Sequence, residues 1–258
     1  MPVASGDTEQ GTADTVELMR QFEVNGVVTL PNRLDADLIE RLRSAFMPLL
    51  ENYVASQPPN RGAVRHQMYL PFRAPFDDPG LWADPTVIAV VEALLGPDAE
   101  CTYYGSDTPY PGAEHQPTHQ DGAPLFPDWA PRPPPYCIAM NVPLVDVDET
   151  NGPFEWFDGA ERPEPDAVPH RVTGPAGTVL LRDTRVWHRG SPHDGTAPRP
   201  MLALLYTRSW YRFPLERPVM DQATYLALDD RGQRLFRNAD IADRPRAAGD
   251  QPRLAVRT

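Results

Sequence analysis

Residues 177–191 have the sequence GTVLLRDTRVWHRGS, in which two short runs of apolar and β-branched residues flank a polar turn. Each run is typical of a β-strand, because strands favour β-branched and aromatic residues and are bounded by turn formers. The second run contains His188, and histidine is a common metal ligand and acid–base group. The stretch therefore predicts two strands and places a candidate functional residue at the end of the second.

Short strand-like runs dominate the chain from about residue 99 onward. They lie between clusters of Pro, Gly, Asp and Asn, at residues 99–105, 136–145, 152–159, 177–183, 185–191 and 201–210. A few helices followed by many short strands indicate an α+β chain, mainly β, built on a β-sandwich or barrel.

Helical patterns precede these strands. Apolar residues near spacings of three and four predict helices within 15–24 and 35–54. Residues 84–96 carry an Asp N-cap, a Pro at the first helical position and a Gly just past the end, which predict a third helix. Residues 27–30 predict a strand, and residues 57–80, rich in Pro, Arg and Phe, predict a long loop.

The length of 258 residues fits one large domain with appendages. We expect residues 1–13, which are small and polar, to be disordered. A folded domain with N-terminal helices should span 14–213, followed by a C-terminal extension over 214–258.

Composition and charge limit the partners. The net charge of −12 argues against a nucleic acid or an anionic membrane surface, because both need basic patches. Cys101 and Cys137 lie in apolar, strand-like contexts and predict buried thiols in a reducing compartment. We see neither a signal peptide nor a membrane span. We therefore expect a cytoplasmic protein, a monomer or homodimer, that acts on a small molecule.

His119 and Asp121 form a His-x-Asp pair in the stretch HQPTHQDGAPLFPDW, residues 115–129. Residues two apart on a strand share a face, so both side chains can converge on one ion. Two imidazoles and one carboxylate, with His188 as the third ligand, are the set used by non-haem Fe(II) oxygenases. Alone, the His-x-Asp pair is explained at least as well by a hydrogen bond within a loop.

Arg199 is a further candidate residue of this site. It follows His188 after a polar connection, and a hairpin of that length would return it to the neighbourhood of the metal. There its guanidinium can hold a carboxylate with two parallel hydrogen bonds. The alternative is a surface salt bridge.

At this point the sequence resembles the phytanoyl-CoA dioxygenase family of Fe(II)/2-oxoglutarate oxygenases. The resemblance rests on HQD at 119–121, NGP at 151–153, HRGS at 188–191 and Arg199, in that order. The opening FEVNGVVTLPNRLDADLIERLRSAF, residues 22–46, is similar to the helix–strand–helix that begins family members.

The resemblance runs from about residue 16 to 210. It implies a double-stranded β-helix, a jelly-roll or cupin-like core, with flanking N-terminal helices. It implies that His119, Asp121 and His188 bind iron and that Arg199 pairs with the distal carboxylate of 2-oxoglutarate. The implied cofactors are Fe(II), 2-oxoglutarate and O₂, with ascorbate as a stimulant.

Further cosubstrate contacts follow from the same resemblance. Gln116 matches a position that contacts the cosubstrate in fungal relatives, and Asn141 is a second candidate. Family members often carry Ser or Thr two residues after the distal histidine, where this chain has Gly190, and Ser191 one position later is the candidate replacement. Some carry Asn where this chain has His193.

The substrate side is less determined. Phe126, Trp129 and Tyr136 are candidate pocket residues, although loop aromatics pack onto a domain just as often. Arg73, in the run YLPFR, is a candidate that reaches the site. His115 cannot form a helical pair with His119 across Pro117, so we interpret it as a loop or pocket-rim residue.

We therefore predict a non-haem Fe(II)/2-oxoglutarate-dependent dioxygenase. The expected reaction is hydroxylation, with desaturation, epimerisation and cyclisation left open. The Ala-, Arg- and Pro-rich composition resembles that of high-GC bacteria. The family resemblance implies that stand-alone members there often act in secondary metabolism, such as antibiotic biosynthesis, so we favour a natural-product intermediate over an acyl-CoA. The alternative is a metal-dependent cupin-type hydrolase or isomerase that does not use 2-oxoglutarate.

Overall fold

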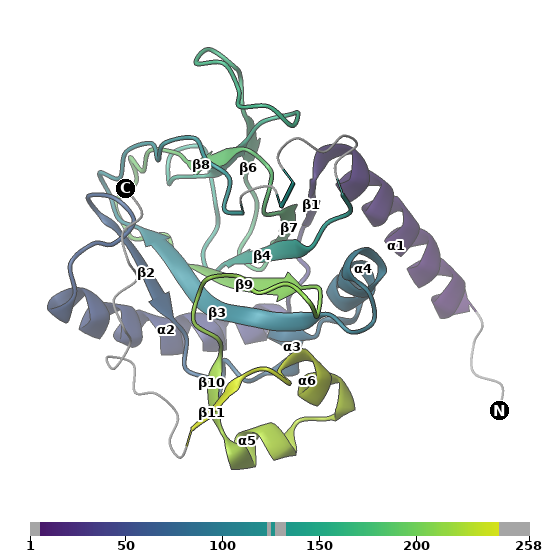
Figure 1. Ribbon diagram of the computed structural model, residues 1–258. Helices are drawn as coiled ribbons and strands as arrows, with labels where there is room; N and C mark the ends of the chain where they lie inside the picture. Colours follow the sequence, from purple (N-terminus) through teal and green to yellow (C-terminus); the bar gives the residue numbers. More distant parts are fainter. Residues whose placement is uncertain (1–5, 123–124, 127–132, 243–258) are drawn as a thin grey trace.

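Two antiparallel β-sheets form the centre of the computed structural model, which describes residues 6–122, 125–126 and 133–242 (Figure 1). The larger sheet has six strands in the order β1-β7-β4-β9-β3-β2, and the smaller has three in the order β6-β5-β8. The strands are β1 (Val27–Leu30), β2 (Arg65–Tyr69), β3 (Glu100–Pro109), β4 (Cys137–Pro143), β5 (Phe154–Trp156), β6 (His170–Val172), β7 (Val179–Asp183), β8 (His188–Gly190) and β9 (Met201–Thr207).

Helices cover the outer face of the six-stranded sheet (Figure 1). They are α1 (Gly6–Asn25), α2 (Ala36–Ser56), α3 (Pro79–Trp82) and α4 (Pro85–Leu95). The N-caps of α2 and α4 are Asp35 and Asp84, whose side chains each accept two backbone hydrogen bonds in the first turn. The three predicted helices are confirmed, and α2 continues through Pro48 without a break.

Alternation along the strands divides the sheet into two faces. Ile138, Met140 and Val142 of β4 point to the helices and join the main apolar cluster. Their neighbours on β4, among them Ala139 and Asn141, are buried on the opposite face. There, a smaller apolar cluster joins the two sheets, with Val27 and Leu180 packed against Trp156.

Two antiparallel sheets packed face to face, with helices on one outer side, form the predicted jelly-roll. Both strands of residues 177–191 are present, but they belong to different sheets. Strand β7 is paired with β1 and β4, whereas β8 is paired with β5. The chain therefore crosses from one sheet to the other within this stretch, and it places His188 opposite the inner face of the larger sheet.

Two expectations from the sequence are wrong. Residues 57–80 are not only loop, because they contain β2 and the start of α3. The strand was missed because its first three residues, Arg65, His66 and Gln67, are polar, although all five of its residues are buried. Helix α1 begins at Gly6, so residues 6–13 are helical rather than disordered. Once the apolar residues further on nucleate a helix, each added residue gains a backbone hydrogen bond, and polar residues extend it.

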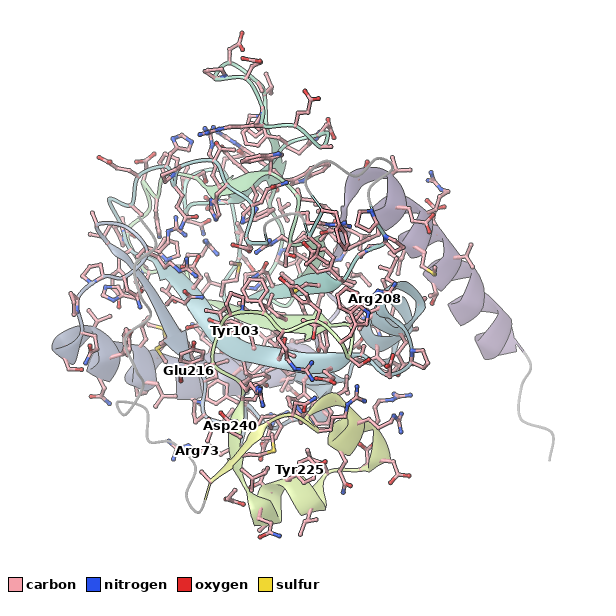
Figure 2. All side chains as sticks on the ribbon, in the orientation of Figure 1. Arg73, Tyr103, Arg208, Glu216, Tyr225 and Asp240 are labelled. Atoms are coloured by element: carbon pink, nitrogen blue, oxygen red, sulfur yellow. The ribbon has the colours of Figure 1, made fainter. Side chains whose placement is uncertain are left out.

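The C-terminal extension folds beside the sheet rather than trailing from it. It contains β10 (Val219–Asp221), α5 (Gln222–Ala227), α6 (Asp230–Leu235) and β11 (Asp240–Ala242), and Figure 2 labels Tyr225 and Asp240 within it. None of the helices in the described ranges is long and apolar enough to cross a bilayer.

Glu100, at the start of β3, anchors this extension. Its side chain is 2% exposed and accepts hydrogen bonds from Arg237 at 2.9 Å and from Asn238 at 2.6 Å. Arg212 adds a contact at 3.3 Å. A buried carboxylate needs such partners, because an unpaired buried charge is strongly destabilising.

We predict that Glu100→Gln lowers the free energy of unfolding by about 1–3 kcal/mol, the usual range for hydrogen bonds to charged groups. The low end is favoured because Arg212 and Arg237 are partly exposed and can be solvated. Denaturant unfolding measures the change, and limited proteolysis within 214–242 should become faster. Glu161→Gln, at an exposed loop position, is the control. Equal stability and proteolysis of both variants would contradict the anchoring role.

Candidate active site

Two reciprocal backbone hydrogen bonds bring the histidines together. The amide of His119 donates to the carbonyl of His188 at 2.9 Å, and the amide of His188 donates back to His119 at the same distance. Gln116 continues the pairing, since its amide donates to the carbonyl of Gly190 at 3.0 Å. The segment before Asp121 therefore lies along β8 as an additional edge of the smaller sheet, and the two imidazole centroids are 4.4 Å apart.

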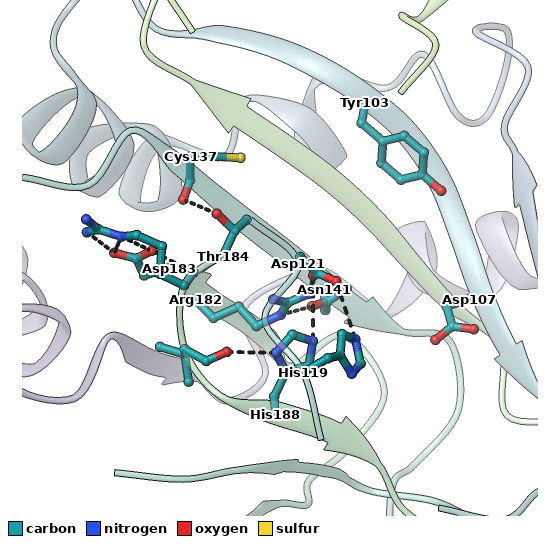
Figure 3. Close-up of polar contacts among 12 residues, drawn as sticks. Tyr103, Asp107, His119, Asp121, Cys137, Asn141, Arg182, Asp183, Thr184 and His188 are labelled. Carbon is teal, nitrogen blue, oxygen red and sulfur yellow. Dashed lines mark hydrogen bonds and ion pairs between the residues drawn. The ribbon is translucent and has the colours of Figure 1, made fainter. Parts of the chain in front are cut away.

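Asp121 is held between two further anchors. The side-chain amide of Gln120 donates to the carbonyl of Arg185, and the amide of Gly122 donates to the carbonyl of Thr184 at 3.1 Å. The Oδ1 atom of Asp121 lies 3.6 Å from Nε2 of His119, and its Oδ2 lies 3.6 Å from Nε2 of His188 (Figure 3). The three potential ligand atoms are within 4.8 Å of one another, so the predicted convergence is confirmed.

The tautomers of both histidines suit a metal. Nδ1 of His119 lies 2.8 Å from the carbonyl of Pro117, and Nδ1 of His188 lies 2.9 Å from the carbonyl of Val186. A carbonyl only accepts, so each Nδ1 carries the hydrogen. In a neutral ring, Nε2 then presents a lone pair toward the carboxylate of Asp121. Lone pairs and a carboxylate facing one space form a donor set that a divalent cation fits.

The protonation states agree with this assignment. Burial, and then the positive charge of Arg182, lower the pKa of His188 from 6.5 to about 3, so its ring is neutral. Burial alone would raise the pKa of Asp121, but Arg182 and then the imidazoles hold it well below its usual range. The site is therefore ready to accept a metal at neutral pH without first losing a proton from either group.

A cavity adjoins the triad. Phe154, which stacks on the ring of His188 with centroids 5.2 Å apart, forms one wall. The lining residues are Asn141, Pro143, Val147, Phe154, Val172, Thr173, Gly174, Thr178, Leu180, Arg199 and Met201. Nε of Arg199 and Oγ1 of Thr178 are buried and lack a hydrogen-bond partner within the described ranges. Buried donors without partners are rare, so this cavity suits a ligand that accepts hydrogen bonds.

Arg65 is a second buried arginine at this site. It lies opposite Pro109 in the pairing of β2 with β3, and the backbone amide of Arg199 donates to the carbonyl of Pro109. Burial, and then the charge of Arg65, lower the pKa of Arg199 to about 10, at which it is still a cation at neutral pH. Asp107 lies 3.4 Å from Arg65, and we find no carboxylate on Arg199 among the described residues. Two cations and one anion leave a net positive charge that fits an anionic ligand.

Arg199 was predicted at the site, but the predicted hairpin is wrong. Strand β8 belongs to the smaller sheet and β9, which Arg199 precedes, belongs to the larger one, so the connection crosses between sheets. Asn141 lines the same cavity, in agreement with its predicted position. Arg65 and Thr178 were missed, because an arginine within an apparent loop and a threonine in a strand carry no signal until their partners are known.

The remaining cosubstrate candidates have partners within the fold. Oε1 of Gln116 accepts a hydrogen bond from the amide of Gly190 at 2.9 Å, which holds it beside β8. Ser191 is buried and its hydroxyl donates to the carbonyl of Pro153 at 2.6 Å, so the structure gives it a role in loop packing. His193 is also buried; Nε2 lies 2.8 Å from the carbonyl of Ala197, and Nδ1 accepts from the amide of Gly195.

The substrate candidates separate into three groups. Tyr136 is buried on the inner face of the sheet, whereas the side chain of Phe126 is about half exposed. Trp129 lies outside the described residues. Arg73 is exposed, in a loop that packs on the helix side of the sheet, so its predicted reach into the site is wrong. Its neighbour Phe72 packs into the cluster on the helix side, which turns this loop away from the triad.

A largely aromatic cluster, of which the sequence analysis named only Tyr136, lies on the inner face of the larger sheet. It consists of Tyr69, Tyr103 and Tyr136 with partly buried residues after β9: Tyr211, Phe213 and Leu215. Figure 3 shows Tyr103 on β3, on the same side of the sheet as the triad. His115 is an exposed loop residue, one of the two positions expected for it, with Nε2 3.4 Å from the buried carboxylate of Glu155.

Comparisons with known proteins agree with this geometry. EvdMO1 matches over 76% of this chain with a TM-score of 0.59 and 17% identity, and this chain spans 50% of that one. SnoN, a non-heme alpha ketoglutarate dependent epimerase from nogalamycin biosynthesis, matches over 82% of this chain and 95% of its own, with a TM-score of 0.58 and 15% identity. HygX from Streptomyces hygroscopicus, solved with nickel and 2-oxoglutarate bound, matches over 76% and 88%, with a TM-score of 0.56 and 17% identity. At such identities these likenesses show the fold.

The family itself is shown by sequence. The family model for phytanoyl-CoA dioxygenase (PhyH) matches residues 22–201, which include the whole triad and Arg199. This match covers well over half of the chain. The protein therefore belongs to the phytanoyl-CoA dioxygenase family, a family of non-haem Fe(II)/2-oxoglutarate-dependent dioxygenases.

Proposed function

We propose that this protein hydroxylates, or otherwise oxidatively tailors, a small organic molecule, with a natural-product biosynthesis intermediate as the favoured class. One observation carries the proposal: the triad adjoins a cavity with two buried groups, Nε of Arg199 and Oγ1 of Thr178, that lack hydrogen-bond partners within the described ranges. The charges of Arg65 and Arg199 there exceed that of Asp107. That combination suits a metal and a dicarboxylate together. A metal-dependent hydrolase or isomerase that does not use 2-oxoglutarate does not require a positively charged cavity for a dicarboxylate.

Iron would be held by His119, Asp121 and His188. Three protein ligands on one face leave positions open for a bidentate cosubstrate and for O₂. When bound there, Fe(II) supplies the activation of O₂, coupled to oxidative decarboxylation of 2-oxoglutarate to succinate. The task of the protein residues is to bind and orient both organic molecules and to exclude water.

The distal carboxylate of 2-oxoglutarate would enter the cavity with Arg199. The guanidinium of Arg199 and the hydroxyl of Thr178 offer it the buried donors identified above. Leu180, Met201 and Val147 form apolar walls suited to its methylene groups. Arg65 strengthens the positive potential, and Asp107 offsets part of it and holds Arg65 in place.

The substrate would bind on the other side of the metal, against the aromatic group of Tyr69, Tyr103 and Tyr136. Apolar and aromatic walls with few polar groups are typical of small-molecule pockets. Tyr103 accepts a hydrogen bond at 2.8 Å from Gln67, which orients its hydroxyl on this face of the sheet. The similar structure SnoN is an epimerase of nogalamycin biosynthesis, which gives further support to a tailoring role.

The direct test measures succinate release from 2-oxoglutarate under air with Fe(II) and ascorbate. Candidate intermediates are then screened by mass spectrometry for the gain of one oxygen atom or the loss of two hydrogens. We expect succinate formation to depend on Fe(II) and to rise with a true substrate. Product formation that is equally fast without 2-oxoglutarate would instead support the hydrolase or isomerase alternative.

We predict that Asp121→Ala and His188→Ala each lose saturable metal binding, because each removes one of only three protein ligands. Anaerobic titration with Co(II), followed by visible absorption, measures this directly. His115→Ala, which changes an exposed loop histidine outside the triad, should bind Co(II) like the unmodified protein. Retained binding in both triad variants would contradict the assigned ligands.

We predict that Arg199→Met raises the apparent KM for 2-oxoglutarate about 10- to 100-fold, since a hydrogen-bonded charged group is usually worth about 1.5–3 kcal/mol. Metal binding should be unchanged, because Arg199 does not contact the triad. Steady-state kinetics with varied 2-oxoglutarate gives the first value and Co(II) titration the second. An unchanged KM would remove Arg199 from this role.

We predict that Gly190→Ala also weakens 2-oxoglutarate binding, through Arg65. A Cβ at position 190 would lie 2.4 Å from Nη2 of Arg65 and 2.8 Å from its Cζ, so the guanidinium must move. Calorimetric titration of the metal-loaded protein measures the loss. The double variant Gly190→Ala/Arg65→Met should be no worse than Arg65→Met alone, since both act on one side chain; additive losses would refute the coupling.

A further inference from the structure

Arg182 is a buried cation in contact with the metal site. It lies on β7 opposite Ala139 of β4 and Val27 of β1, on the inner face of the larger sheet. Its Nη2 donates a hydrogen bond to Oδ2 of Asp121 (Figure 3). Its side chain is 8% exposed, whereas that of Asp121 is 25% exposed. Arg182 is therefore the more deeply fixed member of the pair.

The guanidinium is held from several sides before any metal binds. Its Nε donates to Oδ1 of Asn141 at 3.3 Å, and its Cζ lies 5.3 Å from the ring centroid of Phe154. A cation over an aromatic face is attracted to it, most strongly where water is excluded. The small side chain of Ala139, its register partner on β4, leaves room for the arginine. These contacts fix the direction in which Nη2 points.

Asp121 has little else to orient its carboxylate. Apart from the two imidazoles at 3.6 Å, Arg182 is the side chain that contacts it in the described part of the chain. The hydrogen bond engages Oδ2, which also lies 3.6 Å from Nε2 of His188, while Oδ1 lies 3.6 Å from Nε2 of His119. Rotation of this carboxylate would turn its oxygens away from both imidazoles.

We propose that Arg182 is a positioning residue for the metal site: it holds the carboxylate of Asp121 so that its oxygens face Nε2 of both His119 and His188 before a metal binds. The inference rests on metal binding at the triad, and it assigns a task that none of the three ligands performs. Partners that hydrogen-bond to metal ligands commonly set ligand orientation, and their loss costs about 10- to 100-fold in metal affinity.

Electrostatic repulsion alone predicts the opposite change in metal affinity. A cation beside a divalent metal repels it, so removing Arg182 would tighten metal binding if repulsion dominated. We expect the orienting effect of Arg182 to outweigh this repulsion. The carboxylate of Asp121 is partly exposed, and without Arg182 the metal itself would have to order it. The sign of the change in affinity therefore separates the two effects.

The test is anaerobic Co(II) titration of the full chain, followed by visible absorption. Arg182→Met should weaken Co(II) binding about 10- to 100-fold, and Arg182→Lys, which keeps a charged donor of similar length, should recover part of that loss. The absorption spectrum of bound Co(II) should change in Arg182→Met, because it reports the number of coordinated atoms. Arg171→Met is the matched control, since Arg171 pairs with the buried carboxylate of Glu155 away from the triad.

Each outcome is decisive. Circular dichroism and thermal unfolding establish that the variants are folded, and Arg182→Lys serves if Arg182→Met is not. Equal or tighter Co(II) binding by a folded Arg182→Met, with an unchanged spectrum, would overturn the inference while leaving the proposed function intact. If the unmodified protein binds no Co(II), the proposed function fails, and this inference fails with it.

Discussion

The pair of backbone hydrogen bonds between His119 and His188 is the constraint on which the site depends. One histidine follows β3 in the chain and the other begins β8, so no local preference brings them together. The two peptide groups align the segment before Asp121 along the smaller sheet and fix the spacing of both imidazoles. Backbone pairing tolerates changes of side chain, and the side chains at these two positions are thereby free to serve chemistry rather than structure.

The second organising feature is the distribution of buried charge. Arg65, Arg182 and Arg199 are all nearly inaccessible to water, yet they approach only two carboxylates at the site, those of Asp107 and Asp121, among the described residues. Burying a charge is costly unless it is paired, so the described residues leave an excess of positive charge that an anionic ligand would offset. A dicarboxylate beside a metal meets that requirement. The protein as a whole carries a net charge of −12, which makes this local positive site stand out.

Much of this arrangement was evident from the sequence, for identifiable reasons. Helix α4 was delimited by Asp84 and Gly96 because cap residues act locally. The triad was found because ligand types at a distinctive spacing, combined with a family resemblance, restrict the alternatives. Arg65 and Arg182 were missed because their roles depend on pairing between strands: each is defined by what lies opposite it, and no spacing along the chain records that.

The errors have a similar origin. Arg73 was assigned to the site because of its charge within an aromatic run, but Phe72 and Phe76 pack on the helix side and turn the loop outward. Ser191 was predicted to contact the cosubstrate because it follows Gly190, yet its hydroxyl donates to the carbonyl of Pro153. In both cases the residue type was suitable and the direction of the side chain was wrong, and direction is fixed by tertiary packing.

Because the chain crosses between the sheets, the site is made of two parts, and these parts tolerate sequence changes to different degrees. The parts proposed for iron and 2-oxoglutarate lie mainly on strands of the two sheets or immediately beside them, where an insertion would shift every pairing. The aromatic side of the site draws Tyr211, Phe213 and Leu215 from the connection after β9, which carries no strand pairing there. Within it, Arg212 also contacts Glu100, but Tyr211, Phe213 and Leu215 can be exchanged without disturbing a strand pairing. Under the proposed function, substitutions at these three positions would redirect the oxidative chemistry to new molecules while the strands that carry the triad stay unchanged.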